Sequence, residues 1–158
     1  MNAQQTLVLA RRISASPIRV MDQGPRRASL AQAVLDSVDP SVWAPRYADR
    51  PTNVLLFEGI GDTMTANIST DALAVALDAQ PLAPALRPIA GLPRAGAAPG
   101  PVVRGNRAAG RGTAALLQLA PTRGEDGHFV LYDEPGAGDA LARFVRTAFD
   151  EPPATLTR

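Results

Sequence analysis

Two residues, Asp62 and His128, have the side chains that acid–base chemistry requires. His128 is the only histidine of the chain, and an imidazole ring takes up and releases a proton near neutral pH. A carboxylate that accepts a hydrogen bond from Nδ1–H fixes the tautomer of the ring and stabilises its protonated form. The other ring nitrogen is then free to take a proton from a hydroxyl group. We therefore consider Asp62 as a candidate acid and His128 as a candidate base of a nucleophilic site.

Each candidate follows an apolar run that predicts a buried strand, at residues 54–57 and 114–119. Such continuous runs are typical of parallel strands that helices cover on both faces. The carboxyl ends of parallel strands gather functional loops at one edge of the sheet. If the two strands are neighbours, their ends lie about 5 Å apart. We then expect the carboxylate of Asp62 within about 3.2 Å of an imidazole nitrogen of His128.

Three segments with helical spacing of apolar residues are expected to cover these strands. Ser29 is the predicted cap of the first, which ends before Pro40, and Ser69 or Thr70 is the predicted cap of the second. Asp139 is the predicted cap of the third. The expected inner face of this third helix comprises Leu141, Phe144, Val145, Ala148 and Phe149. Trp43, Pro45 and Tyr47 are expected in a loop.

The remaining segments have few apolar residues in a regular pattern. Residues 1–28 are predicted to be a poorly ordered lead-in to a domain at residues 29–158. Residues 79–112 are rich in proline, glycine and arginine, which predicts a long irregular insertion that buries little surface. The predicted fold is therefore of the α/β class. It has two parallel strands joined by a right-handed crossover, three helices and the insertion.

The composition argues against several classes of function. The net charge of +1, with arginine as the only basic residue type, gives no basic field for nucleic acid. Cysteine is absent and there is one histidine, so we expect no metal site, and we predict no cofactor. The glycine motifs at residues 59–61 and 105–110 lack the other residues of phosphate-binding loops. The apolar run at residues 6–10 is too short for a signal peptide or a membrane span, which predicts a cytoplasmic location.

Residues 53–63, NVLLFEGIGDT, resemble the penultimate strand and acid loop of the α/β-hydrolase superfamily, especially its bacterial esterase and lipase-like members. Residues 126–130, DGHFV, and the helix after them resemble the histidine loop and final helix of that family. The resemblance covers about residues 29–149. It implies a partial α/β-hydrolase fold with Asp62 as the triad acid and His128 as the general base, in the family order of nucleophile, acid and histidine. Glu58 and Asp126 are the alternative acids.

The sequence contains no Gly-x-Ser-x-Gly motif and no equivalent with another nucleophile. We therefore expect the acid- and histidine-bearing part of a carboxylic-ester hydrolase, inactive alone, that completes its site with a nucleophile from outside this chain. Its expected partners are an N-terminal hydrolase half, or a second copy bound through an exposed sheet edge. An ester would be the substrate of the completed enzyme. The alternative is a non-catalytic interaction module that retains the strands.

Overall fold

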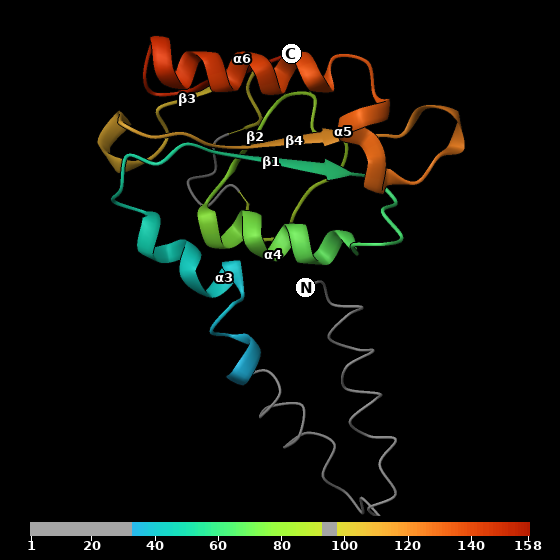
Figure 1. Cartoon of the computed structure of the whole chain (residues 1–158), viewed down its shortest axis with the longest axis horizontal. Coiled ribbons are helices and arrows are strands. Elements are labelled where there is room, and N and C mark those ends of the chain that lie inside the picture. The colour runs from blue at the N-terminus through green and yellow to red at the C-terminus, as the bar shows by residue number, and fades with distance from the viewer. Residues whose placement is uncertain (1–32, 93–97) are drawn as a thin grey trace, which may run out of the picture.

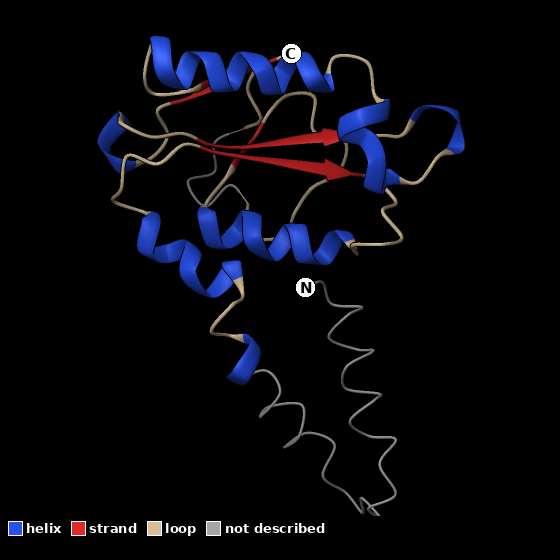
Figure 2. Cartoon of the chain, in the orientation of Figure 1, coloured by secondary structure: helices blue, strands red, loops and turns tan. Residues whose placement is uncertain are grey.

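The computed structural model describes residues 33–92 and 98–158. In this part of the chain a small parallel sheet lies between helices, which is an α/β architecture (Figure 1). The sheet has the strand order β1-β4-β2, formed by Val54–Gly59, Ala114–Leu119 and Gln80–Pro81. Strands β1 and β4 are parallel and in register from Val54 opposite Ala114 to Gly59 opposite Leu119. The prediction of two parallel strands at these positions is confirmed, and Figure 2 shows them pointing the same way.

Alternate residues of the strands contribute to two separate cores, because successive side chains of a strand point to opposite faces. On one face Leu55, Phe57 and Leu117 pack with helix α6, Ala137–Asp150. On the other face Val54, Leu56 and Leu116 pack with helix α4, Asn67–Leu77. Figure 1 shows the two helices on opposite sides of the sheet. Coverage on both faces explains why these strands read as continuous apolar runs.

Both long helices begin at other residues than the sequence predicts. Helix α4 begins at Asn67, with Ala66 rather than Ser69 or Thr70 at the cap position. Helix α6 begins at Ala137 after Gly136, whose φ of 85° lies in the left-handed region that favours glycine. Asp139 therefore lies in the first turn of α6, where its negative charge is favourable, rather than at the cap.

The buried face of α6 is rotated from the predicted one. Ala137, Ala140 and Phe144 are buried, and Ala148 packs against them. Phe149 is 82% exposed and Val145 is 45% exposed, so the prediction that these two face the core is wrong. The alanine-rich face of α6, and not its more apolar face, is therefore the one that packs on the sheet.

The region before β1 is helical where the structure describes it. The predicted lead-in and the predicted cap Ser29 lie outside the described residues. Residues 33–35 are helical, but Val34 and Val38 are exposed rather than buried. The predicted loop around Trp43 and Tyr47 is wrong, since helix α3, Pro40–Trp43, leads directly into the 3-10 helix η1, Ala44–Tyr47. Asp39 starts this turn by accepting a hydrogen bond from the backbone N–H of Ser41.

Residues 79–112, where they are described, form only short regular elements, but several of their side chains are buried, which the sequence did not predict. Strand β2 adds to the free side of β4, and strand β3, Val102–Arg104, pairs antiparallel with the C-terminal strand β5, Thr155–Thr157. Leu82 and Val103 are completely buried in the core under α6, and Ile89 is buried on the α4 side. These strands are two or three residues long and have no periodicity that a sequence pattern could reveal.

Short helical turns occupy the connections at the edges of the sheet. They are η2, Ala108–Gly110; η3, Thr122–Gly124; η4, Gly127–Phe129; and α5, Val130–Asp133. Among the residues described, no helix has the length and apolar character that crossing a membrane requires.

Candidate acid and histidine site

Strands β1 and β4 end at the same edge of the sheet, and the loops that follow them carry the two predicted site residues (Figure 1). The loop after β1 leads through Asp62 to α4. The loop after β4 leads to η4, which contains His128. The backbone N–H of Ile60 donates to the carbonyl of Leu119 at 2.8 Å, which extends the pairing beyond the strand ends. The two loops therefore start from fixed, adjacent positions.

The structure brings Asp62 and His128 into contact. Oδ2 of Asp62 lies 3.1 Å from Nδ1 of His128, so the distance predicted from the sequence is confirmed. The side chain of Asp62 is 13% exposed and that of His128 is 38% exposed. The opposite ring nitrogen, Nε2, forms no hydrogen bond with any residue that the structure describes. The pair is therefore a carboxylate-oriented imidazole with its second nitrogen available.

The backbone of its own turn holds the carboxylate of Asp62. Oδ1 accepts hydrogen bonds from the N–H groups of Met64, at 2.8 Å, and Thr65, at 2.6 Å. This is the local turn that an aspartate in a glycine-rich loop often forms. Because the turn uses Oδ1 alone, Oδ2 remains directed at the histidine ring. Asp62 thus stabilises its loop through Oδ1 and orients the imidazole through Oδ2.

Asp126 joins the two loops without contacting the imidazole. Its Oδ1 accepts hydrogen bonds from the backbone N–H of His128 at 2.9 Å and of Thr63 at 3.1 Å. Its Oδ2 accepts a hydrogen bond from the hydroxyl of Thr63. The Thr63 hydroxyl, followed by the N–H of His128, lowers the pKa of Asp126 from its ordinary value. Asp126 therefore positions the loops, and Asp62 rather than Asp126 is the acid that contacts the ring.

Two glycines allow the loops to approach each other at backbone distance. A Cβ atom added at Gly59 would lie 1.7 Å from the carbonyl oxygen of Gly127. One added at Gly127 would lie 2.7 Å from the carbonyl oxygens of Gly59 and Ile60, and 2.8 Å from the nitrogen of Asp62. No side chain fits at either position. The sequence contains both glycines, but the contact between them depends on the pairing of β1 with β4.

Asn67, which sequence reasoning missed, closes the acid loop from the first residue of α4. Its Oδ1 accepts from the N–H of Gly61 at 3.1 Å, and its Nδ2 donates to the carbonyl of Gly59 at 2.7 Å. An asparagine a few residues after a Gly-x-Gly-Asp turn is the available sequence signal. An asparagine at this spacing can form these hydrogen bonds, but the spacing alone does not show that it does.

Glu58, the other alternative acid, belongs to a separate hydrogen-bond network with Arg87 and Gln118. Its side chain is completely buried and accepts hydrogen bonds from Arg87 and, at 2.7 Å, from Nε2 of Gln118. Arg87 also pairs with Asp71 of α4, and these carboxylates raise the pKa of Arg87, partly opposed by desolvation. Both oxygens of Glu58 are thus engaged on the α4 side of the sheet.

The ring of His128 contacts one carboxylate and one aromatic side chain. The ring of Phe129 lies 5.0 Å away, edge to face. Phe129 is 43% exposed. The hydroxyl of Thr63 donates to Asp126, so it is not a nucleophile activated by the imidazole. Within the described ranges no hydroxyl group is hydrogen-bonded to His128, and no three His, Asp and Glu side chains lie close enough to hold a metal ion.

The chain was compared with protein-family models, with curated proteins and with solved structures, and none of the three comparisons found a match.

Proposed function

We propose that this chain is the acid- and histidine-bearing part of a serine hydrolase that acts on carboxylic esters. The contact between Oδ2 of Asp62 and Nδ1 of His128 carries the proposal. The carboxylate keeps the proton on Nδ1, so Nε2 has a lone pair that can accept a proton from a hydroxyl nucleophile. The positive charge that then develops on the ring is stabilised by Asp62.

The nucleophile and the oxyanion hole would come from outside this chain. The sequence has no Gly-x-Ser-x-Gly motif, and these two features contribute the largest part of acyl-transfer catalysis. The outer edge of β1 supports this arrangement, because β1 is the terminal strand of the described sheet. Its free backbone groups can pair with a further strand, which would bring a nucleophile to the carboxyl edge beside His128.

The state of the histidine can be tested in the chain by itself. His128 is the only histidine, so its imidazole nitrogen signals need no assignment in an NMR experiment on ¹⁵N-labelled protein. We expect the neutral ring to carry its proton on Nδ1, and Asp62→Ala to convert it to a mixture of tautomers. Asp133→Ala, at an exposed carboxylate of α5, is the control and should leave the tautomer unchanged. A ring protonated mainly on Nε2 would contradict the proposal.

The activity can be tested by co-expression with the polypeptide encoded directly upstream. We expect the chain alone not to hydrolyse nitrophenyl esters, and the combination to do so if the upstream frame contains Gly-x-Ser-x-Gly. Asp62→Asn should then lower kcat about 10⁴-fold, because the amide favours the wrong tautomer. Activity of the combination that survives His128→Ala would overturn the assignment.

The outer edge of β1 also favours a second function, that of a non-catalytic interaction module. An unpaired strand edge can bind an extended peptide through backbone hydrogen bonds. Two results would favour this alternative. The upstream reading frame would contain no nucleophile motif, and Asp62→Ala would leave the tautomer of His128 unchanged.

A further inference from the structure

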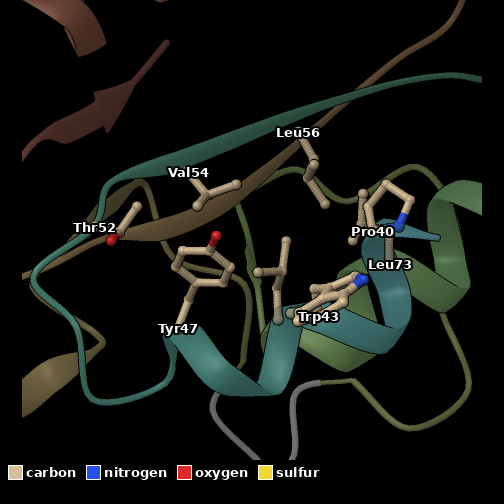
Figure 3. Close-up of a pocket in the computed structure, with 9 residues that line it drawn as sticks. Pro40, Trp43, Tyr47, Thr52, Val54, Leu56 and Leu73 are labelled. Atoms are coloured by element: carbon tan, nitrogen blue, oxygen red, sulfur yellow. The ribbon is translucent and has the colours of Figure 1, made fainter. Parts of the chain in front are cut away.

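A second concave site lies on the α4 side of the sheet, and none of its lining residues belongs to the acid and histidine pair. Helices α3 and η1 lie beside the edge strand β1 and in front of α4, and a pocket of about 330 Å³ remains between them (Figure 3). It is lined by Pro40, Trp43, Ala44, Tyr47, Thr52, Val54, Leu56, Leu73 and Leu77.

The pocket is separate from the acid and histidine pair. Val54 is the first residue of β1 and Leu56 lies near its middle, whereas Asp62 follows the opposite end of the strand. None of the lining residues takes part in the hydrogen bonds that hold Asp62, Asp126 and His128. A ligand in this pocket would therefore not be held by the residues assigned to ester hydrolysis.

The interior of the pocket is apolar and has aromatic walls. Trp43 and Tyr47 lie one helical turn apart, and their rings face the side chains of β1 and α4 (Figure 3). Nε1 of Trp43 donates to the carbonyl of Ser37 at 3.0 Å, so this polar group is already satisfied. Trp43 and Tyr47 remain 38% and 40% exposed although they line an apolar cavity. Such a site favours an apolar ligand body over water.

Two guanidinium groups lie against the aromatic walls. The guanidinium of Arg46 is 4.1 Å from the centre of the Trp43 ring, and that of Arg50 is 5.5 Å from the centre of the Tyr47 ring. These are stacking distances for a cation on an aromatic face. Neither arginine forms an ion pair with any residue that the structure describes. The two arginines are exposed and stack on rings that line the pocket, without being lining residues themselves, and their charges are available to an anion bound there.

The volume limits the size of the ligand. A water molecule occupies about 30 Å³ in the liquid, so a pocket of about 330 Å³ holds about ten non-hydrogen atoms. We propose that this pocket binds a medium-chain carboxylate, with its alkyl chain between Trp43, Tyr47 and the apolar residues of β1 and α4, and its carboxylate at Arg46 and Arg50. The proposal does not rest on the ester-hydrolase function, and each can fail without the other.

Trp43 is the only tryptophan of the chain, so its fluorescence reports on the pocket directly. We expect decanoate, at concentrations below those that form micelles, to change the Trp43 emission in a saturable manner and to raise the Tm of the full chain. Decanol and decylamine have the same alkyl chain without the negative charge. Each should bind at least tenfold more weakly than decanoate. An unchanged emission and Tm with decanoate, or equal binding of decanol, would overturn the proposal.

Two matched pairs of variants localise the binding. Leu73→Phe adds volume inside the pocket and should weaken decanoate binding at least tenfold. Leu141→Phe, at a half-buried leucine of α6 on the other side of the sheet, should not change it. Arg46→Gln should weaken binding several-fold, whereas Arg146→Gln, at an exposed arginine of α6, should have no effect. Because all four positions are exposed or half-buried, the variants are expected to fold. Equal effects within either pair would refute the assigned site.

Discussion

Glu58 and Asp62 are both carboxylates at the end of β1, and they differ in almost every respect. Glu58 is completely buried, and both its oxygens are bound by side chains from distant parts of the chain. Asp62 is 13% exposed, and the backbone of its own loop holds one of its oxygens. The other oxygen faces the only histidine. The comparison separates a carboxylate that joins segments of the fold from one that is free to act on an imidazole.

The network of Glu58 holds Leu86 and Arg87 against the sheet. Gln118 donates to Glu58 and accepts, through Oε1, from the backbone N–H groups of Leu86 and Arg87. Arg87 completes the network with ion pairs to Glu58 and Asp71. A segment without a regular apolar pattern is thus held by polar contacts together with the buried side chains of Leu82 and Ile89. Complete burial of the carboxylate accompanies a structural role, whereas the carboxylate of the candidate site is partly exposed and directs one oxygen at the imidazole.

The largest expected effect comes from Glu58→Ala. It leaves Arg87 and Gln118 without their shared partner, and breaking a buried ion pair destabilises a protein by about 3 kcal/mol or more. Arg87 is partly exposed and can turn toward water, so we expect the free energy of unfolding to fall by about 3 kcal/mol rather than more. Denaturant titration measures this loss. The tautomer of His128 should be unchanged, and a changed tautomer would show that the two carboxylates are not independent.

Gly127→Ala should disturb the contact between the loops that carry Asp62 and His128. Its Cβ would meet backbone atoms at 2.7–2.8 Å, and an overpacked site costs about 2 kcal/mol. We expect the free energy of unfolding to fall by this amount. Because the loops move apart, we also expect Asp62→Ala to change the tautomer of His128 less in this variant than in the original protein.

Gly138→Ala is the control for this substitution. Nothing lies within 4 Å of a Cβ at Gly138, which is in helix α6. Because alanine is the better helix former, this variant should be more stable than the original by about 0.5–1 kcal/mol. If both alanines destabilised the protein equally, the close contact between Gly59 and Gly127 would not be the cause.

Asp62→Ala should have a smaller effect on stability than Glu58→Ala. It removes the acceptor for the N–H groups of Met64 and Thr65, a loss comparable to that of a helix cap, about 1 kcal/mol. Denaturant titration of the two variants side by side tests the contrast. A loss for Asp62→Ala as large as that for Glu58→Ala would mean that Asp62 is a structural carboxylate too.

The sequence allowed prediction of those features that depend on local patterns. The apolar runs of β1 and β4 are local patterns, and Asp62 and His128 lie in the connections that follow these strands. Parallel pairing of the strands brings the two connections to the same edge of the sheet. Strands β2 and β3 could not be predicted, because their register is set by partners far along the chain. The exposed Phe149 of α6 shows the same limit, since the choice between two apolar helix faces depends on how closely the helix packs.

The smallest expected effect concerns Asp126, which connects the two loops. Its hydrogen bonds from Thr63 and His128 lower its pKa in the folded chain, so they contribute stability that is present above its unfolded pKa of about 4. This contribution is lost as the pH falls through the lowered folded pKa, since the protonated carboxyl is a poorer acceptor. Below about pH 4 the original protein should therefore lose stability more steeply than Asp126→Asn, whose amide does not titrate. Denaturant midpoints measured from pH 6 to pH 2.5 test this.

Asp133→Asn is the matched control, because the carboxylate of Asp133 forms no hydrogen bond with a residue that the structure describes. Its denaturant midpoint should follow the pH dependence of the original protein. The contribution of Asp126 is small because the group is exposed to solvent, where salt and water weaken its interactions. The original protein should thus be slightly more stable than Asp126→Asn near pH 6, and the two midpoints should converge as the pH falls. Parallel profiles at acid pH would show that Asp126 does not hold the acid and histidine loops together through its charge.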